Sequence, residues 1–252
     1  MSIKLYAFTC GTITSDLGNF LDGESGPVTV PVPAYLIDHP EGKVLFDTGL
    51  NRGLRQDAAR LLGPLAGSYE VSLPATDDIA SRLEALGIDP RSVRYLVNSH
   101  LHFDHCGGNA LIPNATVIVQ RKEWRAAQNE EMRRAGAYSP HDFDHGHEIR
   151  QIDGEFDIYG DGLLVLFPTT GHTPGHQSLR VRLQSGEVVL AADCCYFKRT
   201  LDAGHLPPFA YRKDDMLVSL KRIAAMQAGG ARIFFGHDPE FWKTVPQSVA
   251  ME

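Results

Sequence analysis

The sequence predicts a layered α/β fold, and two observations carry this prediction. Short apolar segments typical of strands occur in mixed order with segments that have the periodicity of amphipathic helices. Several of the short segments are apolar at consecutive positions, which suits strands that are covered on both faces. The chain has 252 residues and no Pro/Gly/Ser-rich linker, charge block or composition shift, so we expect one domain over residues 1–252.

The strands are predicted from short apolar runs. These runs are residues 35–37, 44–46, 95–97, 117–119, 163–167, 188–191 and 233–235. Two helices are predicted from apolar residues that recur on one face and from a glycine at the end. The first covers 78–86, with Ile79, Leu83 and Leu86 on its apolar face, and stops at Gly87. The second covers 214–227 and has Leu217, Leu220, Ile223 and Ala224 on its apolar face.

A third helix is predicted for residues 123–134. This segment is more polar than the other two and ends at Gly136, so we expect it on the surface.

Composition excludes several functional classes. The net charge is −7, with 31 acidic and 24 basic residues, so no basic stripe is available to neutralise the phosphates of a nucleic acid. No window approaches about 18 consecutive apolar residues, and residues 1–8 lack the features of a signal peptide, so we expect no membrane span and a cytoplasmic location. The four cysteines form no Cys-x-x-Cys pair, which argues against a disulfide framework or a thiolate zinc site.

The densest group of chemically active residues is the hexad His100-Leu101-His102-Phe103-Asp104-His105, directly after the predicted strand 95–97. Imidazole and carboxylate are the groups that bind zinc and similar metals. They are costly to bury without partners, so the hexad does not suit an ordinary core. At the end of a strand, where the chain turns, such side chains can converge on one point. The hexad therefore predicts a metal site.

Three further candidate ligands also follow directly on predicted strands. His172 follows 163–167, Asp193 follows 188–191, and His237 follows 233–235. Ligands gather at strand ends because the loops there are free to turn side chains inward. Glycines next to His172 and His237 allow tight bends of the backbone.

The residue types divide between two ions. One ion is assigned to His100, His102 and His172, and the other to Asp104, His105 and His237. The carboxylate of Asp193 has two oxygens and could bridge both ions. Each ion would keep an open coordination position, which is typical of a catalytic site. Two metals about 3.5–4 Å apart can share a hydroxide nucleophile and polarise the group that it attacks.

Together these motifs resemble the metallo-β-lactamase superfamily, in order and across almost the whole chain. The resemblance includes the hexad, Asp47-Thr48-Gly49, the segment 171–176, Asp193 and Gly236-His237. The chain is most similar to the N-acyl-homoserine lactone lactonases, the quorum-quenching branch. The branch is indicated by Ser99 before the hexad and Gly107-Gly108-Asn109 after it, the segment 173–179, Tyr196 three residues after Asp193, and the segment 233–238. The chain departs from the pattern at Cys194-Cys195, where small or hydroxyl residues are expected.

The resemblance implies an αββα sandwich, with two mixed sheets flanked by helices and a dinuclear site at one edge between the sheets. It implies zinc as the usual metal, although iron, cobalt or manganese would suit the same ligands. The substrate would be a small-molecule lactone, with no nucleic acid or membrane as partner. Tyr196 and one metal would stabilise the developing oxyanion, and Asp104 would carry a proton to the leaving oxygen. Monomer and homodimer both stay open.

Alternative functions stay open beside this one. The chain could act on another small lactone, such as 4-pyridoxolactone, or be a related dinuclear-metal ester or thioester hydrolase. A catalytically silent, metal-stabilised binding protein is a different class, which the open coordination positions argue against. An apolar substrate groove would favour acylated lactones. Six residues lie in segments that resemble the walls of such a groove and are equally compatible with ordinary core: Leu17, Phe20, Leu21, Leu61, Leu62 and Leu65.

Other polar residues have simpler interpretations. Asp47 either accepts a hydrogen bond from a ligand imidazole or forms the turn before Thr48-Gly49. His176 is expected to be a structural partner, and the histidine-rich segment 141–147 a polar surface loop. We interpret Cys194 and Cys195 as packing residues.

Overall fold

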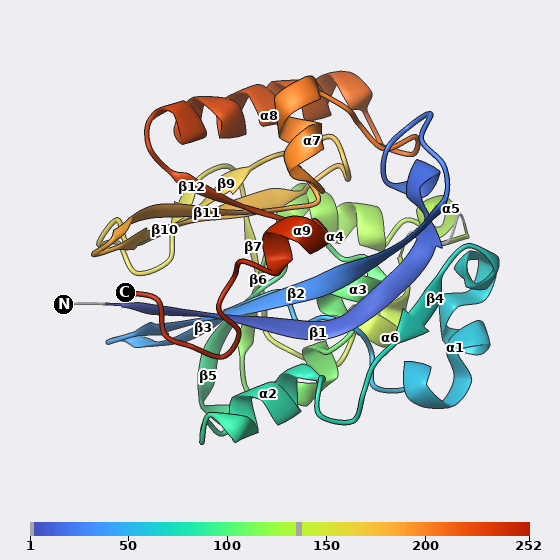
Figure 1. Ribbon diagram of the computed structural model, residues 1–252. Helices are drawn as coiled ribbons and strands as arrows, with labels where there is room; N and C mark the ends of the chain where they lie inside the picture. Colours follow the sequence, from blue (N-terminus) through green and yellow to red (C-terminus); the bar gives the residue numbers. More distant parts are fainter. Residues whose placement is uncertain (1–2, 135–137) are drawn as a thin grey trace.

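Two β-sheets lie face to face in the computed structural model, and helices cover their outer sides (Figure 1). The structure describes residues 3–134 and 138–252. The helix–sheet–sheet–helix layering confirms the predicted αββα sandwich. This layering arises because the central strands are apolar on both faces, and such strands are stable only when each face is covered.

The larger sheet has seven strands in the order β4-β1-β2-β3-β5-β6-β7. Its N-terminal strands pair antiparallel, whereas β3, β5, β6 and β7 run parallel. The strands are β1 (Lys4–Asp16), β2 (Pro27–His39), β3 (Gly42–Phe46), β4 (Glu70–Ser72), β5 (Val93–Val97), β6 (Thr116–Gln120) and β7 (Ile149–Ile152).

The smaller sheet has five strands in the order β12-β11-β10-β9-β8. The β11–β12 pair is parallel and the other pairs are antiparallel, so this sheet is mixed as well. The strands are β8 (Phe156–Asp157), β9 (Leu164–Pro168), β10 (Gln177–Leu183), β11 (Gly186–Ala192) and β12 (Arg232–Phe235).

Helices cover the outer faces and build the walls of one edge. The helix α8 packs on the outside of the smaller sheet and α2 on the outside of the larger one (Figure 1). The helices are α1 (Leu54–Leu62), α2 (Ile79–Ala85), α3 (Phe103–Cys106), α4 (Arg121–Ala127), α5 (Glu130–Arg134), α6 (Pro140–Phe143), α7 (Lys198–Ala203), α8 (Lys213–Ala228) and α9 (Pro239–Trp242). No helix within the described residues is long and apolar enough to cross a membrane.

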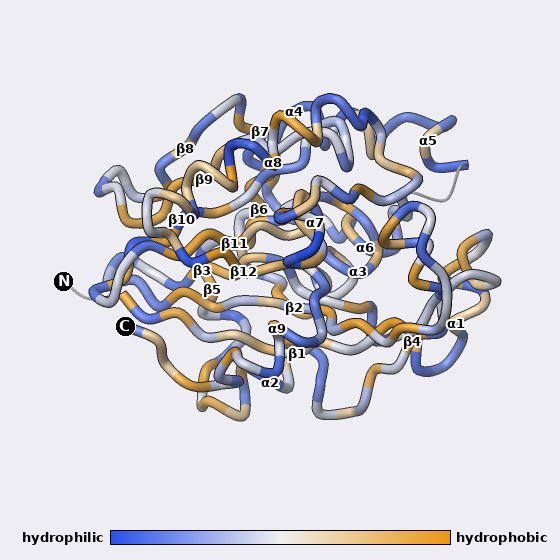
Figure 2. The backbone as a smooth tube through the Cα atoms, turned by 45° about the horizontal axis from the view of Figure 1, so that its top comes forward, coloured by the Kyte–Doolittle hydropathy of each residue, from blue (hydrophilic) through white to orange (hydrophobic). Residues whose placement is uncertain are grey.

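The main core lies between the sheets and joins them. Phe46 and Ile37 of the larger sheet belong to the same buried cluster as Leu166, Leu190 and Phe234 of the smaller one. In Figure 2 the hydrophobic colour lies mainly on the central strands, including β11 and β12. Burial of this apolar surface is the dominant favourable contribution to folding, and it fixes the position of the strand ends relative to one another.

All seven predicted strands are present, and the helix predicted over 78–86 is confirmed as α2, with Asp78 as its N-cap. The helix predicted over 214–227 is confirmed as α8, but its predicted apolar face is partly wrong. Leu217 is 37% exposed, whereas Met216 is buried beside Leu220 and Ile223. The buried stripe thus begins one residue earlier than the apolar pattern predicted.

The predicted surface helix 123–134 is wrong in two respects. The structure has two short helices, α4 and α5, that are interrupted around residues 128–129, and Glu123 in the first turn of α4 is fully buried. The predicted end at Gly136 lies outside the described residues. A polar sequence suggested exposure, but the polar side chain of Glu123 has buried partners, which are described below.

Asp78 joins α2 to the start of α1. Its carboxylate accepts hydrogen bonds from Arg52 Nη2 (2.7 Å), Arg55 Nη2 (2.8 Å) and the Ser81 amide (3.1 Å). Burial raises the pKa of Asp78, but these donors outweigh burial and lower it from 3.8 to about 2. The ionised Asp78 carboxylate therefore contributes its full stabilisation of the folded state above pH 4, and this contribution is lost as the pH falls through 2.

We expect Asp78→Asn to lower the free energy of unfolding at pH 7 by about 1 kcal/mol, because the partly exposed arginines are screened by solvent. The difference from the original chain should shrink as the pH falls from 4 to 2. Urea unfolding at several pH values measures this, and a difference that does not depend on pH would contradict it.

Candidate metal centre

The seven predicted ligands lie together at one edge of the sandwich. Each follows the carboxyl end of a strand: the hexad follows β5, His172 follows β9, Asp193 follows β11 and His237 follows β12. The two sheets face each other, so these loops meet although they are far apart in the sequence. Within the described ranges, grouped ligand atoms occur in two clusters, and these are the two groups that the sequence predicted.

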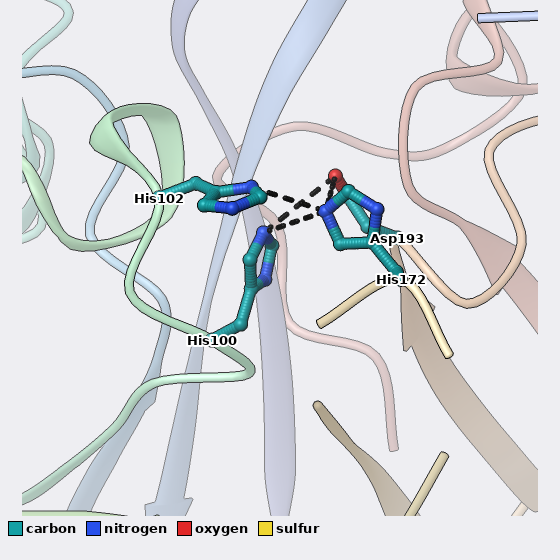
Figure 3. Close-up of side chains that lie close together, drawn as sticks. All are labelled: His100, His102, His172 and Asp193. Carbon is teal, nitrogen blue, oxygen red and sulfur yellow. Dashed lines mark hydrogen bonds and ion pairs between the residues drawn. The ribbon is translucent and has the colours of Figure 1, made fainter. Parts of the chain in front are cut away.

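The first cluster consists of His100, His102, His172 and Asp193, whose ligand atoms lie within 4.8 Å of one another. Figure 3 shows these four side chains pointing toward one another. His172 Nε2 lies 3.2 Å from His100 Nε2, 3.1 Å from His102 Nδ1 and 3.3 Å from Asp193 Oδ2. Three imidazoles and one carboxylate oxygen thus face a single point.

The second cluster consists of Asp104, His105 and His237, also within 4.8 Å of one another. The other carboxylate oxygen of Asp193 faces this cluster. Asp193 Oδ1 lies 3.1 Å from His105 Nε2 and 3.1 Å from His237 Nε2. Asp104 Oδ2 is 3.6 Å from each of these two nitrogens. One oxygen of Asp193 therefore faces each cluster, as a bridging ligand requires.

The arrangement fits divalent cations better than it fits hydrogen bonding alone. His105 Nε2 and Asp193 Oδ1 are buried and lack a hydrogen-bond partner, although they are only 3.1 Å apart. Buried polar atoms in folded proteins rarely stay without a partner. A set of imidazoles and carboxylates that converge in this way is the donor set of zinc and related metals.

Neighbouring groups orient the ligand rings. The Nδ1 atom of His105 lies 2.9 Å from Asp47 Oδ2, and that of His237 donates to the carbonyl of Pro31 at 2.8 Å. Both contacts leave Nε2 free to face the cluster. Asp47 has a positive φ of 60°, and its Oδ1 accepts the Ser99 amide at 2.7 Å. The predicted contact of Asp47 with the imidazole of a candidate ligand is thus confirmed, and its strained backbone is typical of functional sites.

Burial and charge set the protonation of the histidines. Burial lowers the pKa of His100 and of His172 well below the usual value, so both stay neutral, as metal ligands must. Burial also lowers the pKa of His105 and His237, but the neighbouring carboxylates, Asp193 above all, outweigh burial and raise both. Burial raises the pKa of Asp193, yet the neighbouring His105 and His237 hold it well below its usual range.

Backbone geometry explains why small residues stand beside the ligands. The pairing of β11 with β12 is irregular between Leu190 and Ala192, and Ala192 has a φ of 46°. This irregularity turns Asp193 away from the sheet and into the site. Gly171 has a φ of 131°, and a Cβ atom there would lie 2.2 Å from the Met216 amide nitrogen. Only glycine allows the loop of His172 to pack so closely on α8.

The clusters open into a cavity of about 480 Å³. His102, Asp104, His172, Asp193 and His237 line its floor, together with Tyr196. The Tyr196 hydroxyl lies 3.2 Å from His172 Nδ1, so this residue contacts a candidate ligand as well as the cavity. The apolar part of the lining includes Ile13, Phe20, Leu65, Phe103, Met132 and Phe209.

The six predicted groove residues have different places. Phe20 and Leu65 line the main cavity, and Leu61 and Leu62 line, with Leu65, a neighbouring cavity of about 310 Å³. Leu21 is fully buried core and Leu17 packs against the same cluster.

Residues with simpler predicted roles mostly follow those predictions. The His176 ring bonds Thr169 Oγ1 through Nδ1 at 2.9 Å and packs against His100, as a structural partner would. Cys194 and Cys195 are buried in the cluster beneath α8 and pack as predicted. The surface-loop prediction for 141–147 is only partly right. Residues 144–146 are exposed, but residues 140–143 form α6 and bury Asp142, which accepts a hydrogen bond from Asn51 at 2.9 Å.

Comparison with known proteins agrees with this geometry. The sequence profile described as "Metallo-beta-lactamase superfamily" matches residues 28–237. The chain belongs to the metallo-β-lactamase superfamily. Both ligand clusters lie inside the matched range.

Similar members of the superfamily are named as lactonases. The N-acyl homoserine lactonase AttM of Azorhizobium caulinodans is 34% identical over 249 residues, which cover 95% of each chain. The N-acyl homoserine lactonase AiiA of Bacillus thuringiensis subsp. kurstaki is 33% identical over 216 residues, which cover 84% of this chain and 83% of AiiA.

A solved structure shows that the similarity extends over the whole fold. It is an N-acyl homoserine lactone hydrolase with the product N-hexanoyl-L-homoserine bound at its catalytic metal centre. It matches with a TM-score of 0.89 and 29% identity over 100% of both chains.

Some residues of this superfamily site were not found from the sequence. Ser99 bonds Asp47 and lies 2.9 Å from His100 Nδ1, and its place before the hexad was the only available signal. Glu123 contacts two ligand loops from a helix that looked exposed, so nothing in its local sequence could identify it. Tyr69 and Tyr138 line the cavity only because the fold brings segments together that are distant from the candidate ligands in the sequence.

We expect Asp47→Asn to weaken the binding of added Zn²⁺ by about 10–100-fold, because the ring of His105 loses its charged partner. Competition with a chromogenic chelator measures this affinity. Asp161→Asn is a control, since it neutralises the Asp of another His–Asp contact, in which a partly exposed carboxylate lies 2.9 Å from the buried His39 ring away from the clusters. Equal zinc affinities for the original chain and Asp47→Asn would exclude this role for Asp47.

Proposed function

We propose that this superfamily member is a metal-dependent lactonase that hydrolyses N-acyl-homoserine lactones. One observation carries the proposal: two clusters of candidate ligands share the two oxygens of Asp193 at the floor of a largely apolar cavity. The names of the similar proteins support the same activity. The product bound in the similar solved structure is itself an opened acyl-homoserine lactone.

The proposal assigns each candidate residue a role as a ligand. His100, His102 and His172 would hold one divalent cation, Asp104, His105 and His237 would hold the other, and Asp193 would offer one carboxylate oxygen to each. Zinc suits this donor set, and iron, cobalt and manganese are compatible with it. When bound, two such cations supply an activated water and a positive charge that polarises the lactone carbonyl.

Tyr196 is well placed to stabilise the carbonyl oxygen as it becomes negative. His172 faces its cluster through Nε2, so its Nδ1 carries the hydrogen and donates to the Tyr196 oxygen, 3.2 Å away. The hydroxyl hydrogen of Tyr196 is then free to point at the substrate. Burial raises the pKa of Tyr196 well above its usual value, which keeps this hydrogen in place at neutral pH.

Asp104 is the candidate for proton transfer. Its carboxylate lines the cavity, and its Oδ2 lies 3.6 Å from His237 Nε2. As the attacking water loses a proton, Asp104 accepts it and returns it to the ring oxygen when the C–O bond breaks. The product is an open-chain hydroxy acid, and atoms and charges balance without a covalent enzyme intermediate.

The cavity favours an acylated lactone over a compact polar one. Phe20, Leu65, Phe103 and Met132 give it an apolar wall beside the metal clusters. An acyl chain can bury its apolar surface there, at about 25 cal/mol for each Å² removed from water. A small polar lactone such as 4-pyridoxolactone would leave this wall without a partner.

We expect the purified chain to hold about two divalent ions and to open acyl-homoserine lactones. A proton-release assay with acyl chains of different length, 4-pyridoxolactone and a thioester measures the specificity. Removal of the metal by a chelator should abolish turnover, and added Zn²⁺ should restore it. A metal-loaded protein that opens none of these substrates would instead support the silent binding protein.

Replacement of Tyr196 by Phe removes one donor to the developing oxyanion. We expect Tyr196→Phe to lower kcat by roughly 10–10³-fold with unchanged metal content. Tyr159→Phe is the matched control, because its hydroxyl donates to the Gly42 carbonyl away from the site. A kcat that Tyr196→Phe leaves unchanged would exclude this hydroxyl from the reaction.

A further inference from the structure

Glu123 is a fully buried carboxylate that no step of the proposed reaction uses. It lies in the first turn of α4, between two loops that both carry candidate ligands. Its Oε1 accepts the Leu101 amide at 3.1 Å. Its Oε2 accepts the Thr173 hydroxyl at 2.7 Å and the Gly175 amide at 3.0 Å. All three partners donate, so both oxygens act as acceptors.

The three donors are next to the ligands of the first cluster. Leu101 stands between His100 and His102, and Thr173 directly follows His172. The carboxylate of Glu123 thus joins the loop after β5 to the loop after β9. These are the two loops whose imidazole nitrogens, His102 Nδ1 and His172 Nε2, come within 3.1 Å of each other.

The second cluster lacks this connection. Asp104 and His105 lie in α3, which begins two residues after Leu101, and His237 comes from the loop after β12. Within the described residues, the hydrogen bonds of Glu123 reach neither the loop of His237 nor the side chains of this cluster. A change at Glu123 should therefore affect the three-histidine cluster selectively.

The contact is costly, and the surrounding structure is shaped to allow it. Burial raises the pKa of Glu123. Among the described residues, Glu123 forms no ion pair with a lysine or arginine. Its three hydrogen bonds therefore have to offset the loss of solvation. A Cβ atom on Gly175 would lie 2.1 Å from the Glu123 amide nitrogen, so glycine lets this loop approach α4.

We propose that Glu123 is a positioning residue, whose carboxylate holds the two loops at the separation that the three-histidine cluster needs to bind a divalent cation. This inference rests on the proposed function, because it assumes that both clusters bind metal. It concerns only the affinity of one cluster. Groups that orient metal ligands typically contribute 10–100-fold to metal affinity.

Glu123→Gln tests the inference with little change of shape. The amide has one acceptor oxygen, so its NH₂ group must face a donor on one of the two loops. We expect one of two Zn²⁺ ions to bind about 10–100-fold more weakly, with the affinity of the other unchanged, in chelator competition on the full chain. Asp78→Asn is the matched control, because it also converts a buried carboxylate to an amide but contacts neither loop.

A double-mutant cycle identifies the affected cluster. In a His102→Ala background, which damages the three-histidine cluster directly, Glu123→Gln should cause no further loss of affinity for the remaining ion. Thr173→Val removes a single hydrogen-bond donor to Glu123 and should weaken the binding of the same ion by roughly 2–10-fold. It provides the decisive measurement if Glu123→Gln does not fold.

The outcomes separate the two proposals. Unchanged affinity for both ions, or an equal loss at both, would overturn the role of Glu123 and leave the lactonase proposal intact. An unaltered chain that binds no Zn²⁺ would overturn the proposed function itself. Selective loss of one ion, absent in the His102→Ala background, is the result expected from a positioning role.

Discussion

The buried carboxylate of Asp193 is the group around which the site is organised. Its two oxygens face the two histidine clusters, at 3.1 Å from His237 Nε2 and 3.3 Å from His172 Nε2. A charge buried in this way is stable only if oppositely charged groups surround it. The strained backbone at Ala192 and the absence of a side chain at Gly236, where a Cβ would lie 2.6 Å from the Ala192 carbonyl, both follow from the need to turn Asp193 inward.

The sandwich supplies the rigidity that this arrangement needs. Both sheets contribute to one core, so the carboxyl ends of β5, β9, β11 and β12 are held at one edge. Acceptors from other parts of the chain then fix individual groups: Asp47 holds His105, the Pro31 carbonyl holds His237, and Glu123 holds two loops. The cavity combines this polar floor with an apolar wall, which is the combination that lactone opening with an acyl chain requires.

Much of the fold was predictable because the central strands are short apolar runs between turns. The strands missed by this reasoning have other patterns. β1 mixes polar and apolar residues over Lys4–Asp16, and β10 alternates, with Arg180 and Arg182 directed away from the core. The exposure of Leu217 and the break between α4 and α5 were missed as well. Periodicity reports which residues are apolar, whereas packing against a particular neighbour decides which of them are buried.

The sequence by itself determined the candidate ligands, their division into two clusters and the superfamily, because imidazoles and carboxylates at strand ends have few other uses. Only the tertiary structure decided what holds them. Glu123 and the Pro31 carbonyl lie far from the ligands along the chain and have no local pattern that marks them. Their roles arise from hydrogen bonds that a helix and a strand make to loops distant in the sequence, and such contacts exist only after the two sheets have packed together.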